Sequence, residues 1–207
     1  MKIATLHYIS QGISPEAHLE NIQAVCQAGG KWIQLRMKAV PEKVYLETAL
    51  TVRQICDAHG ATFIVNDNIH VALASQADGV HLGQEDESPA IARKVLGTEK
   101  IIGGTANTLA QCQELITAGV DYIGLGPYRF TKTKAKLSPV LGLDGYTHIL
   151  SQLSGNIPVI AIGGITSKDI KALRATGIHG VAVSGMLSTT QDAAVATQLQ
   201  TLTTTLI

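Results

Sequence analysis

The chain has 207 residues, of which 45% are hydrophobic and only 15% are charged. Lys and Arg number 16 and so do Asp and Glu, which gives a formal net charge of zero. This composition excludes a charge-rich disordered chain, and it does not fit a protein that binds nucleic acid or anionic membranes through a basic surface. The length suits a single domain, including an α/β barrel.

The first residues of the chain, its apolar runs and its cysteines indicate the cellular compartment. The first ten residues are too short and too polar for a signal peptide, and no run of about 18 apolar residues predicts a membrane span. Cys26, Cys56 and Cys112 lie far apart, without the spacing of a zinc site or a disulfide framework. We therefore expect a cytoplasmic protein with reduced cysteines and no membrane or nucleic-acid partner.

Short apolar runs rich in β-branched residues recur along the chain and predict parallel strands covered on both faces. They occupy residues 3–9, 32–35, 62–65, 79–82, 101–102, 122–125, 159–162 and 180–183. Helical patterns occupy residues 15–28, 41–59, 68–76, 88–96, 108–118 and 167–175. Several of these helices have proline near their start and glycine just past their end, as helices commonly do.

This alternation predicts the fold class α/β, as one (β/α)8 TIM barrel over residues 1–207. Eight strand runs in 207 residues recur about every 26 residues, which suits strand-helix units with right-handed crossovers. A doubly wound sheet is the alternative, disfavoured by the strand count and by the lack of a GxGxxG after the first strand. The longest irregular stretch, at about residues 127–145, is expected to be an active-site loop that closes over substrates.

Polar residues follow the second strand run at alternating positions. Gln34, Arg36 and Lys38 share one face of an extended chain, so we expect them to point into the mouth of the barrel. Charged residues solvated at a strand end are the alternative interpretation. The inward face of a barrel usually carries bulky apolar side chains, which favours a functional role.

Carboxylates follow the third and fourth strand runs and predict a cation site. Asp67 and Asp86 would converge at the tops of neighbouring strands, where Mg²⁺ takes one or two carboxylates and also binds substrate phosphates. Each aspartate has an alternative role as a helix cap, and Glu85 is the alternative ligand. Asn66, which precedes Asp67, lies at the same strand end.

Hydroxyl, basic and glycine residues follow the last four strand runs and predict a phosphate site. Thr131, Thr133 and Lys134 lie in the irregular stretch after the sixth run. Gly164 and Ser184 follow the seventh and eighth runs, at the place where barrels often bind phosphate through backbone amides. A solvated basic loop and glycines that serve turn geometry alone are the alternatives. After the fifth run, Thr105 or Asn107 would face the site, and Thr108 would cap a helix.

The histidines are less informative. His81 is expected to be structural, His7 could line the floor of the pocket, and the other five are expected to be solvated on helices or turns. The sequence shows no Ser/His/Asp or Cys/His arrangement typical of a catalytic triad or dyad, so it does not support hydrolase chemistry. Two anionic subsites in one pocket instead predict a transferase that joins two phosphorylated small molecules.

The motifs that carry these residues resemble those of the thiamine phosphate synthase family, in the family's order, from about residue 30 to 186. They read QLRMK, VNDN, ADGVHLGQED, GLGPYRFTKTK, PVIAIGGI and GVAVSGM. The resemblance implies a (β/α)8 barrel that joins 4-amino-2-methyl-5-hydroxymethylpyrimidine diphosphate to 4-methyl-5-(2-hydroxyethyl)thiazole phosphate. The products would be thiamine phosphate and pyrophosphate.

The resemblance also implies a role for each site residue, with Arg36, Lys38 and Lys134 as the catalytic residues. Mg²⁺ would be held by Asp67 and Asp86. The pyrophosphate would be held by Arg36, Lys38, Asn66 and Lys134. The pyrimidine would contact Gln34 and Thr105, and the thiazole phosphate would be held by Thr131, Thr133, Gly164 and Ser184. A homo-oligomer is compatible with the sequence.

The sequence departs from the family pattern in three places, one of which is added basic charge at Lys136 and nearby residues, to which the resemblance gives no role. Asn107 stands where the family often has His, and the last motif is one residue shorter than usual, which affects the assignment of Ser184. A thiazole tautomerase on the same barrel is the alternative function, although its pattern has His at the position of Pro127 and lacks an intact TxTK motif. A barrel that binds thiazole phosphate without turnover is the non-enzymatic alternative.

Overall fold

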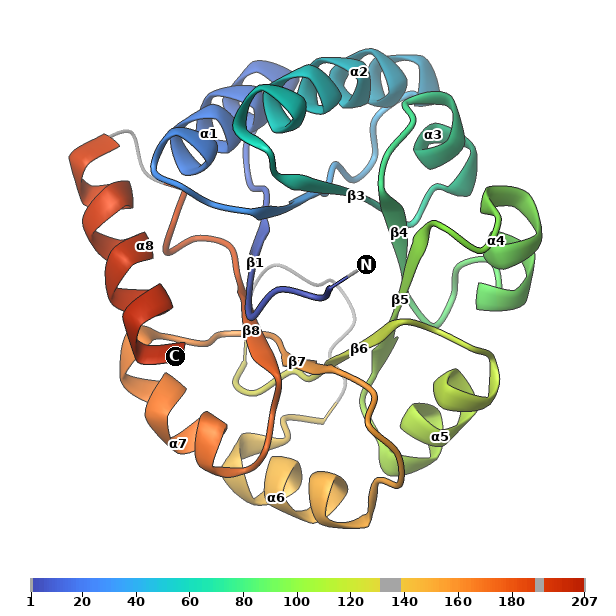
Figure 1. Cartoon of the computed structure of the whole chain (residues 1–207), viewed down its shortest axis with the longest axis vertical. Coiled ribbons are helices and arrows are strands. Elements are labelled where there is room, and N and C mark those ends of the chain that lie inside the picture. The colour runs from blue at the N-terminus through green and yellow to red at the C-terminus, as the bar shows by residue number, and fades with distance from the viewer. Residues whose placement is uncertain (1, 131–138, 189–191, 207) are drawn as a thin grey trace.

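A computed structural model, which describes residues 2–130, 139–188 and 192–206, shows a closed parallel barrel with helices around it (Figure 1). Within this part of the chain, eight strands pair in sequence order, and β1 pairs with β8 to close the barrel. The strands are β1 (Leu6–Ile9), β2 (Trp32–Leu35), β3 (Thr62–Asn66), β4 (Gly79–Leu82), β5 (Ile101–Ala106), β6 (Tyr122–Leu125), β7 (Val159–Ala161) and β8 (Gly180–Val183). The predicted single (β/α)8 barrel is confirmed.

The helices follow the strands and cover the outside of the barrel. They are α1 (Pro15–Gln27), α2 (Glu42–His59), α3 (Ile69–Ala74), α4 (Pro89–Leu96), α5 (Leu109–Thr117), α6 (Gly142–Gln152), a 3₁₀ turn η1 (Ser167–Asp169), α7 (Ile170–Ala175) and α8 (Asp192–Leu206). Because α6 begins at Gly142, the irregular stretch predicted to reach residue 145 ends earlier than expected.

Helix starts follow local side-chain chemistry. Ser14, Asn68, Ser88 and Thr108 each accept a hydrogen bond from a backbone amide in the first turn of α1, α3, α4 and α5. Such caps satisfy amides that have no partner inside the helix. These caps exclude the alternative roles proposed for Asp67 and Asp86, because Asn68 and Ser88 are the residues that cap α3 and α4.

Two apolar cores hold the fold together. The larger lies between the strands and the helices, and the smaller fills the barrel interior around Trp32, Ile64 and Tyr122. His7 stacks on Trp32 with 4.0 Å between ring centroids, so it belongs to this interior core. Gly103 makes room for the neighbouring ring, since a Cβ there would lie 2.2 Å from a Tyr122 ring carbon. The interior of the barrel around Trp32, Ile64 and Tyr122 is therefore packed. Open space lies at the C-terminal ends of the strands.

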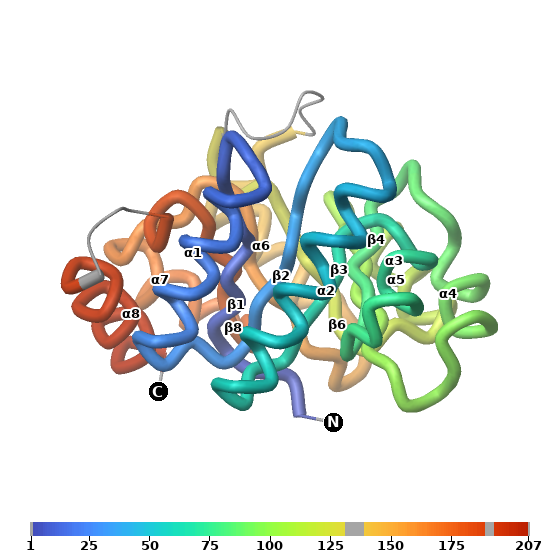
Figure 2. Tube along the Cα trace, turned by 90° about the horizontal axis from the view of Figure 1, so that it is seen from above, coloured from blue at the N-terminus to red at the C-terminus, as the bar shows by residue number. Residues whose placement is uncertain are grey.

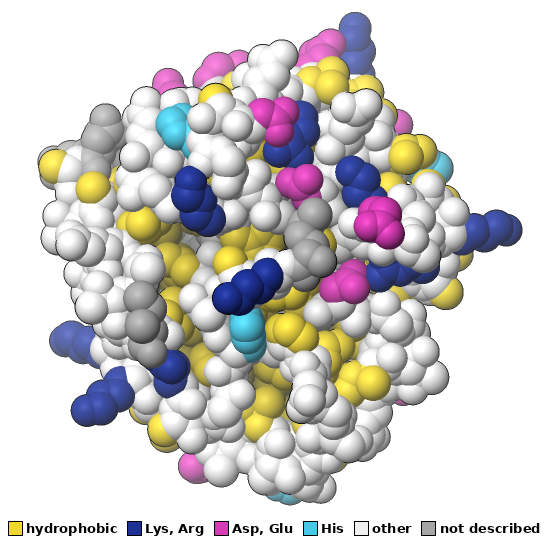
Figure 3. All heavy atoms as spheres, viewed as in Figure 1, with side chains coloured by type: hydrophobic (Ala, Val, Ile, Leu, Met, Phe, Trp, Pro, Cys, Tyr) yellow, Lys and Arg dark blue, Asp and Glu magenta, His cyan; other side chains and the backbone are white. Residues whose placement is uncertain are grey.

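The loops that follow β1 and β2 rise at one end of the barrel, and the N-terminus lies at the other (Figure 2). On the face shown in Figure 3, where the N-terminus lies, described basic and acidic side chains are interspersed and form no broad basic patch. In the described part of the chain, no helix combines the length and the apolar character needed to cross a membrane.

Candidate active site

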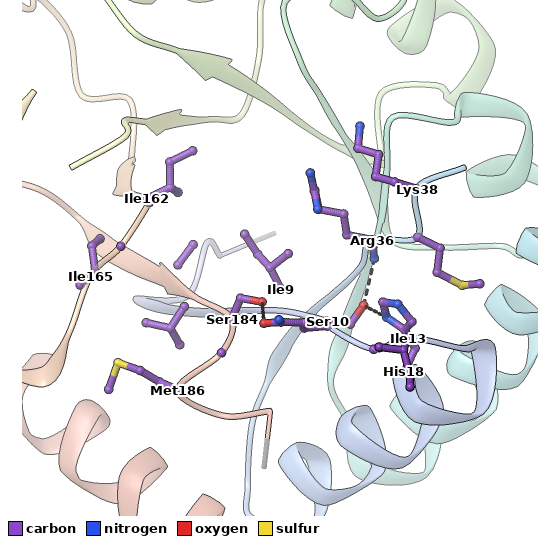
Figure 4. A pocket seen from close by; sticks show the side chains of 18 of the residues that line it. Ile9, Ser10, Ile13, His18, Arg36, Lys38, Ile162, Ile165, Ser184 and Met186 are labelled. Carbon is purple, nitrogen blue, oxygen red and sulfur yellow. Dashed lines mark hydrogen bonds between the residues drawn. The ribbon is translucent and has the colours of Figure 1, made fainter. Parts of the chain in front are cut away.

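A cavity of about 600 Å³ opens at the ends of β1, β2, β7 and β8 (Figure 4). Arg36 and Lys38 extend into it from the segment after β2. Gly164 and Ser184 line it from the segments after β7 and β8. The structure therefore brings together four of the residues predicted from sequence, with the two cations on one side and the glycine turn on the other.

An apolar wall joins these two polar ends. Ile9, Ile162, Ile165 and Met186 line the cavity from β1 and from the segments after β7 and β8 (Figure 4). Ile13, in the loop after β1, also lines the cavity, and its side chain is fully exposed. Such a wall suits a flat, weakly polar ring held between two charged groups. Sequence analysis did not single out these residues, because apolar side chains at strand ends look like ordinary core.

The backbone of Arg36 is held by two residues that sequence analysis missed. Its amide donates to Ser10 Oγ at 3.0 Å, and Ser10 Oγ lies 2.8 Å from His18 Nδ1 (Figure 4). His18 is buried, so the expectation that it is solvated was wrong. It lies four residues before Ile22 on the buried face of α1, a spacing that could have revealed its burial. Burial also lowers the pKa of His18.

Gln34 and Asn66 form a buried pair at the adjoining ends of β2 and β3. Gln34 Nε2 donates to Asn66 Oδ1 at 2.8 Å, and both side chains are buried. The Tyr45 hydroxyl lies 2.9 Å from the carbonyl oxygens of both Leu35 and Asn66, which fixes the two strand ends to α2. Gln34 and Asn66 do not themselves line the cavity.

Two carboxylates and one ammonium group meet beside the cavity. Lys38 Nζ forms an ion pair with Asp67 Oδ2, and Asp86 Oδ2 accepts from the Gly83 amide at 2.6 Å. Desolvation, together with the Asp67 carboxylate beside it, raises the pKa of Asp86 to about 6. Asp67 has a φ of +66°, a left-handed conformation that is uncommon outside glycine and concentrates at functional sites.

This pair of aspartates has the chemistry of a divalent cation site. Desolvation contributes most to the raised pKa of Asp86 and the neighbouring Asp67 carboxylate adds to it, and a bound cation would relieve the repulsion between the two carboxylates. Among the described residues, no group of three or more His, Cys, Asp or Glu side chains gathers to hold a metal ion. Two carboxylates suit Mg²⁺, which commonly keeps several waters and completes its shell with substrate phosphates.

Thr105 is the end of a buried hydrogen-bond chain inside the barrel. His81 Nδ1 lies 2.9 Å from the Tyr122 hydroxyl, and His81 Nε2 lies 2.9 Å from Thr105 Oγ1. His81 is therefore structural, as expected, while Thr105 is buried and does not line the cavity. Asn107 Nδ2 donates to the Gly126 carbonyl, so the side chain that replaces the family's usual His joins the ends of β5 and β6.

Of the remaining predicted site residues, Ser184 and Gly164 are described by the structure and three others are not. Thr131, Thr133 and Lys134 lie outside the described residues. Ser184 Oγ donates to Gln11 Oε1 at 3.4 Å, which ties the segment after β8 to the loop after β1. Gly164 has a φ of +68° and, together with Gly163, forms a turn whose residues line the cavity.

Comparison with known proteins shows which family and which solved structures the chain is similar to. The sequence profile of a family described as thiamine monophosphate synthase matches residues 6–187. A thiamine-phosphate synthase of Flavobacterium johnsoniae is 50% identical over 190 residues, which is 90% of each chain. A thiamine-phosphate synthase of Bacteroides fragilis is 45% identical over 91% of this chain and 94% of its own. A thiamine phosphate pyrophosphorylase structure from Pyrococcus furiosus has a TM-score of 0.83 and 31% identity, and covers 98% of this chain and 95% of that one.

Proposed function

Because this chain belongs to the thiamine monophosphate synthase family and is a thiamine phosphate synthase, we propose that the cavity holds both substrates of that reaction and positions them for transfer. The pyrimidine diphosphate would place its diphosphate against Arg36 and Lys38. The thiazole phosphate would place its phosphate against Gly164 and Ser184. The single observation that carries this assignment is a cavity with two cations on one side and a glycine turn on the other.

The proposed reaction is a dissociative substitution. The bond between the pyrimidine methylene carbon and the diphosphate oxygen breaks first, and its electron pair leaves with pyrophosphate. The ring amino group stabilises the benzyl-like cation, and the thiazole nitrogen then donates its lone pair to the methylene carbon. Because the nucleophile is a neutral ring nitrogen, no protein base is needed, which agrees with the structural rather than catalytic contacts of His81.

The protein contributes charge stabilisation and alignment. Arg36 and Lys134 would stabilise the charge that develops on the leaving pyrophosphate, with Lys38 as a further contact. Asn66, also assigned to the pyrophosphate by the resemblance, is buried against Gln34 and does not line the cavity. Thr131 and Thr133 would join Gly164 and Ser184 at the thiazole phosphate. Gln34 and Thr105, the residues assigned to the pyrimidine by the resemblance, are buried and do not line the cavity, so the structure gives this assignment no support. The apolar wall between the two ends would keep the rings within reach of each other.

Asp67 and Asp86 would hold Mg²⁺. The closeness of the two carboxylates and the raised pKa of Asp86 support this assignment. Bound there, Mg²⁺ would supply Lewis-acid stabilisation of the pyrophosphate oxygens. The ion pair between Lys38 and Asp67 would have to loosen when the diphosphate binds, because the same ammonium group serves both partners. The buried free thiols of Cys26, Cys56 and Cys112 support a cytoplasmic location.

The test is to incubate the pure protein with both substrates and Mg²⁺ and to detect thiamine phosphate by fluorescence after oxidation to a thiochrome. We expect product that disappears with EDTA and returns with added Mg²⁺. Product formed equally well in EDTA would contradict the metal assignment alone. No product from folded protein would favour the tautomerase or the binding-only barrel, which exchange of the thiazole tautomer would then distinguish.

A further inference from the structure

Arg129, just after β6, forms a two-point ion pair with Asp169 of η1. Arg129 Nη1 lies 2.8 Å from Asp169 Oδ2, and Nη2 lies 2.8 Å from Oδ1. The guanidinium carbon also lies 5.0 Å from the centre of the Tyr128 ring. This fork-to-fork geometry fixes the direction of the arginine side chain, which a single ion-pair contact would not do.

Asp169 is itself held from a second side. Its Oδ2 accepts from the Thr166 amide at 2.8 Å and from Thr166 Oγ1 at 2.7 Å. The carboxylate is buried, and the hydrogen bonds from Arg129 keep its pKa well below the usual range. Asp169 therefore stays charged and joins Arg129 firmly to the segment that follows β7.

Arg129 also holds both carbonyl groups of the glycine turn. Its backbone amide donates to the Gly163 carbonyl at 3.0 Å, and its Nη1 donates to the Gly164 carbonyl at 2.9 Å. In a trans peptide unit, the carbonyl of one residue and the amide N–H of the next point in opposite directions. With both carbonyls turned toward Arg129, the N–H groups of Gly164 and Ile165 must point away from it.

Those two N–H groups are available to a ligand. Among the residues that the structure describes, neither the Gly164 amide nor the Ile165 amide has a protein acceptor, and both residues line the cavity. Successive unpaired amides next to left-handed residues form the kind of concave site that binds anions. Arg129 does not line the cavity, and its guanidinium is engaged by Asp169 and Gly164, so it acts on the cavity through the backbone.

We propose that Arg129 is a positioning residue for the thiazole phosphate: held by Asp169, it turns the Gly164 and Ile165 amides toward the phosphate. This inference rests on the proposed function, which places the thiazole phosphate at that turn. It adds a residue that none of the motif matches had assigned a role. Arg129 also lies two residues before Thr131, at the start of the segment that carries Thr131, Thr133 and Lys134.

The test compares Arg129→Gln, Arg129→Lys and Asp169→Asn with wild type in steady-state kinetics, each substrate being varied in turn. Arg174→Gln is the matched control, because Arg174 is an exposed arginine on α7 whose guanidinium donates to the Thr205 carbonyl, away from the cavity lining. We expect Arg129→Gln to raise the KM for thiazole phosphate about 10-fold or more, as for the loss of well-aligned charged hydrogen bonds. The KM for the pyrimidine diphosphate should stay unchanged.

The conservative variant separates positioning from simple folding. Arg129→Lys keeps the charge but not the two-point geometry, so it should fall between wild type and Arg129→Gln. Asp169→Asn keeps an amide oxygen that can still accept from Thr166, and it should raise the same KM by a smaller factor. Should Arg129→Gln fail to fold, Asp169→Asn and Arg129→Lys carry the test.

Titration calorimetry with thiazole phosphate alone keeps this inference distinct from the proposed function. A wild type that binds thiazole phosphate but releases no pyrophosphate would refute the proposed turnover, and weaker binding by Arg129→Gln would still support the positioning role. Unchanged thiazole phosphate binding in folded Arg129→Gln would refute the inference while leaving the synthase activity standing. Equal rises in both KM values with a lowered Tm would also refute it, because they would indicate a structural role only.

Discussion

Gly164→Ala tests how tightly the segment after β6 packs against the glycine turn. A Cβ on Gly164 would lie 3.1 Å from Arg129 Cβ and 3.2 Å from the carbonyl oxygens of both Arg129 and Phe130. Two of these three atoms belong to the backbone and cannot rotate away, so the chain itself must move by a few tenths of an ångström. Gly164 also has a φ of +68°, which an alanine adopts only at a cost.

Gly60→Ala is the matched control for this substitution. Gly60 has a similar φ of +58°, but a Cβ there would meet nothing within 4 Å. The left-handed backbone alone should lower its free energy of unfolding by about 1–2 kcal/mol. Gly164→Ala should lose that amount plus about 1–3 kcal/mol for the crowding. In a chain of this size each kcal/mol shifts Tm by about 2–4 °C.

Urea unfolding and steady-state kinetics on both variants give the answer. We expect Gly60→Ala to keep the wild-type KM for thiazole phosphate and Gly164→Ala to raise it, because the crowded turn also carries the amides proposed to bind the phosphate. A Gly164→Ala protein as stable as Gly60→Ala and with a wild-type KM would refute the reasoning. It would mean that the turn and the segment after β6 move independently.

Three further outcomes can be checked in the same assays. Asp86→Ala should abolish most turnover and raise the Mg²⁺ concentration needed for the rest, and wild-type kinetics in a Mg²⁺ titration would end the metal assignment. Lys134→Ala should lower kcat by about 10²-fold, as for a lost transition-state charge donor, whereas an effect on KM alone would indicate ground-state binding. His7→Phe should flatten the pH dependence of stability below about pH 6.5, measured by urea unfolding at several pH values. Burial and the nearby His81 lower the pKa of His7, so the unfolded chain binds a proton there that the folded chain does not. Stability is then lost as pH falls through that range, by at most about 1.4 kcal/mol per pH unit; an unchanged slope would show that His7 is not the group responsible.

Most of the fold follows from local sequence signals. The predicted run at residues 32–35 is β2, and the proline and glycine signals place α1 and α4 close to their observed starts. Four predicted strand runs differ in length from the observed strands, since β1 begins only at Leu6, β3 continues to Asn66, β5 continues to Ala106 and β7 ends at Ala161. Glycines at residues 103 and 104 hide β5 from an apolar pattern, although they are required there by Tyr122 and Leu115.

The candidate site is partly legible in the sequence. Alternation along one extended segment predicted that Arg36 and Lys38 would share a face, and both line the cavity. The contacts within the site could not be predicted from the sequence. Ser10, His18 and the apolar wall come from segments whose local patterns resemble ordinary loop and core. The ion pair between Lys38 and Asp67 joins the segments that follow β2 and β3, and local sequence patterns did not predict it either.

By itself, the sequence determined the eight strands and their order, six of the helices, and which strand ends carry polar side chains, whereas α6 and α8 were not predicted. These follow from hydrophobic period, caps and turn residues, which act over a few neighbouring residues. Only the tertiary structure decided which distant groups share a hydrogen bond. Arg129 and Asp169 are 40 residues apart, and their pairing depends on β6 and β7 lying side by side in the closed barrel. No local rule encodes that contact, because the barrel's register, rather than the chain's own spacing, brings the two residues together.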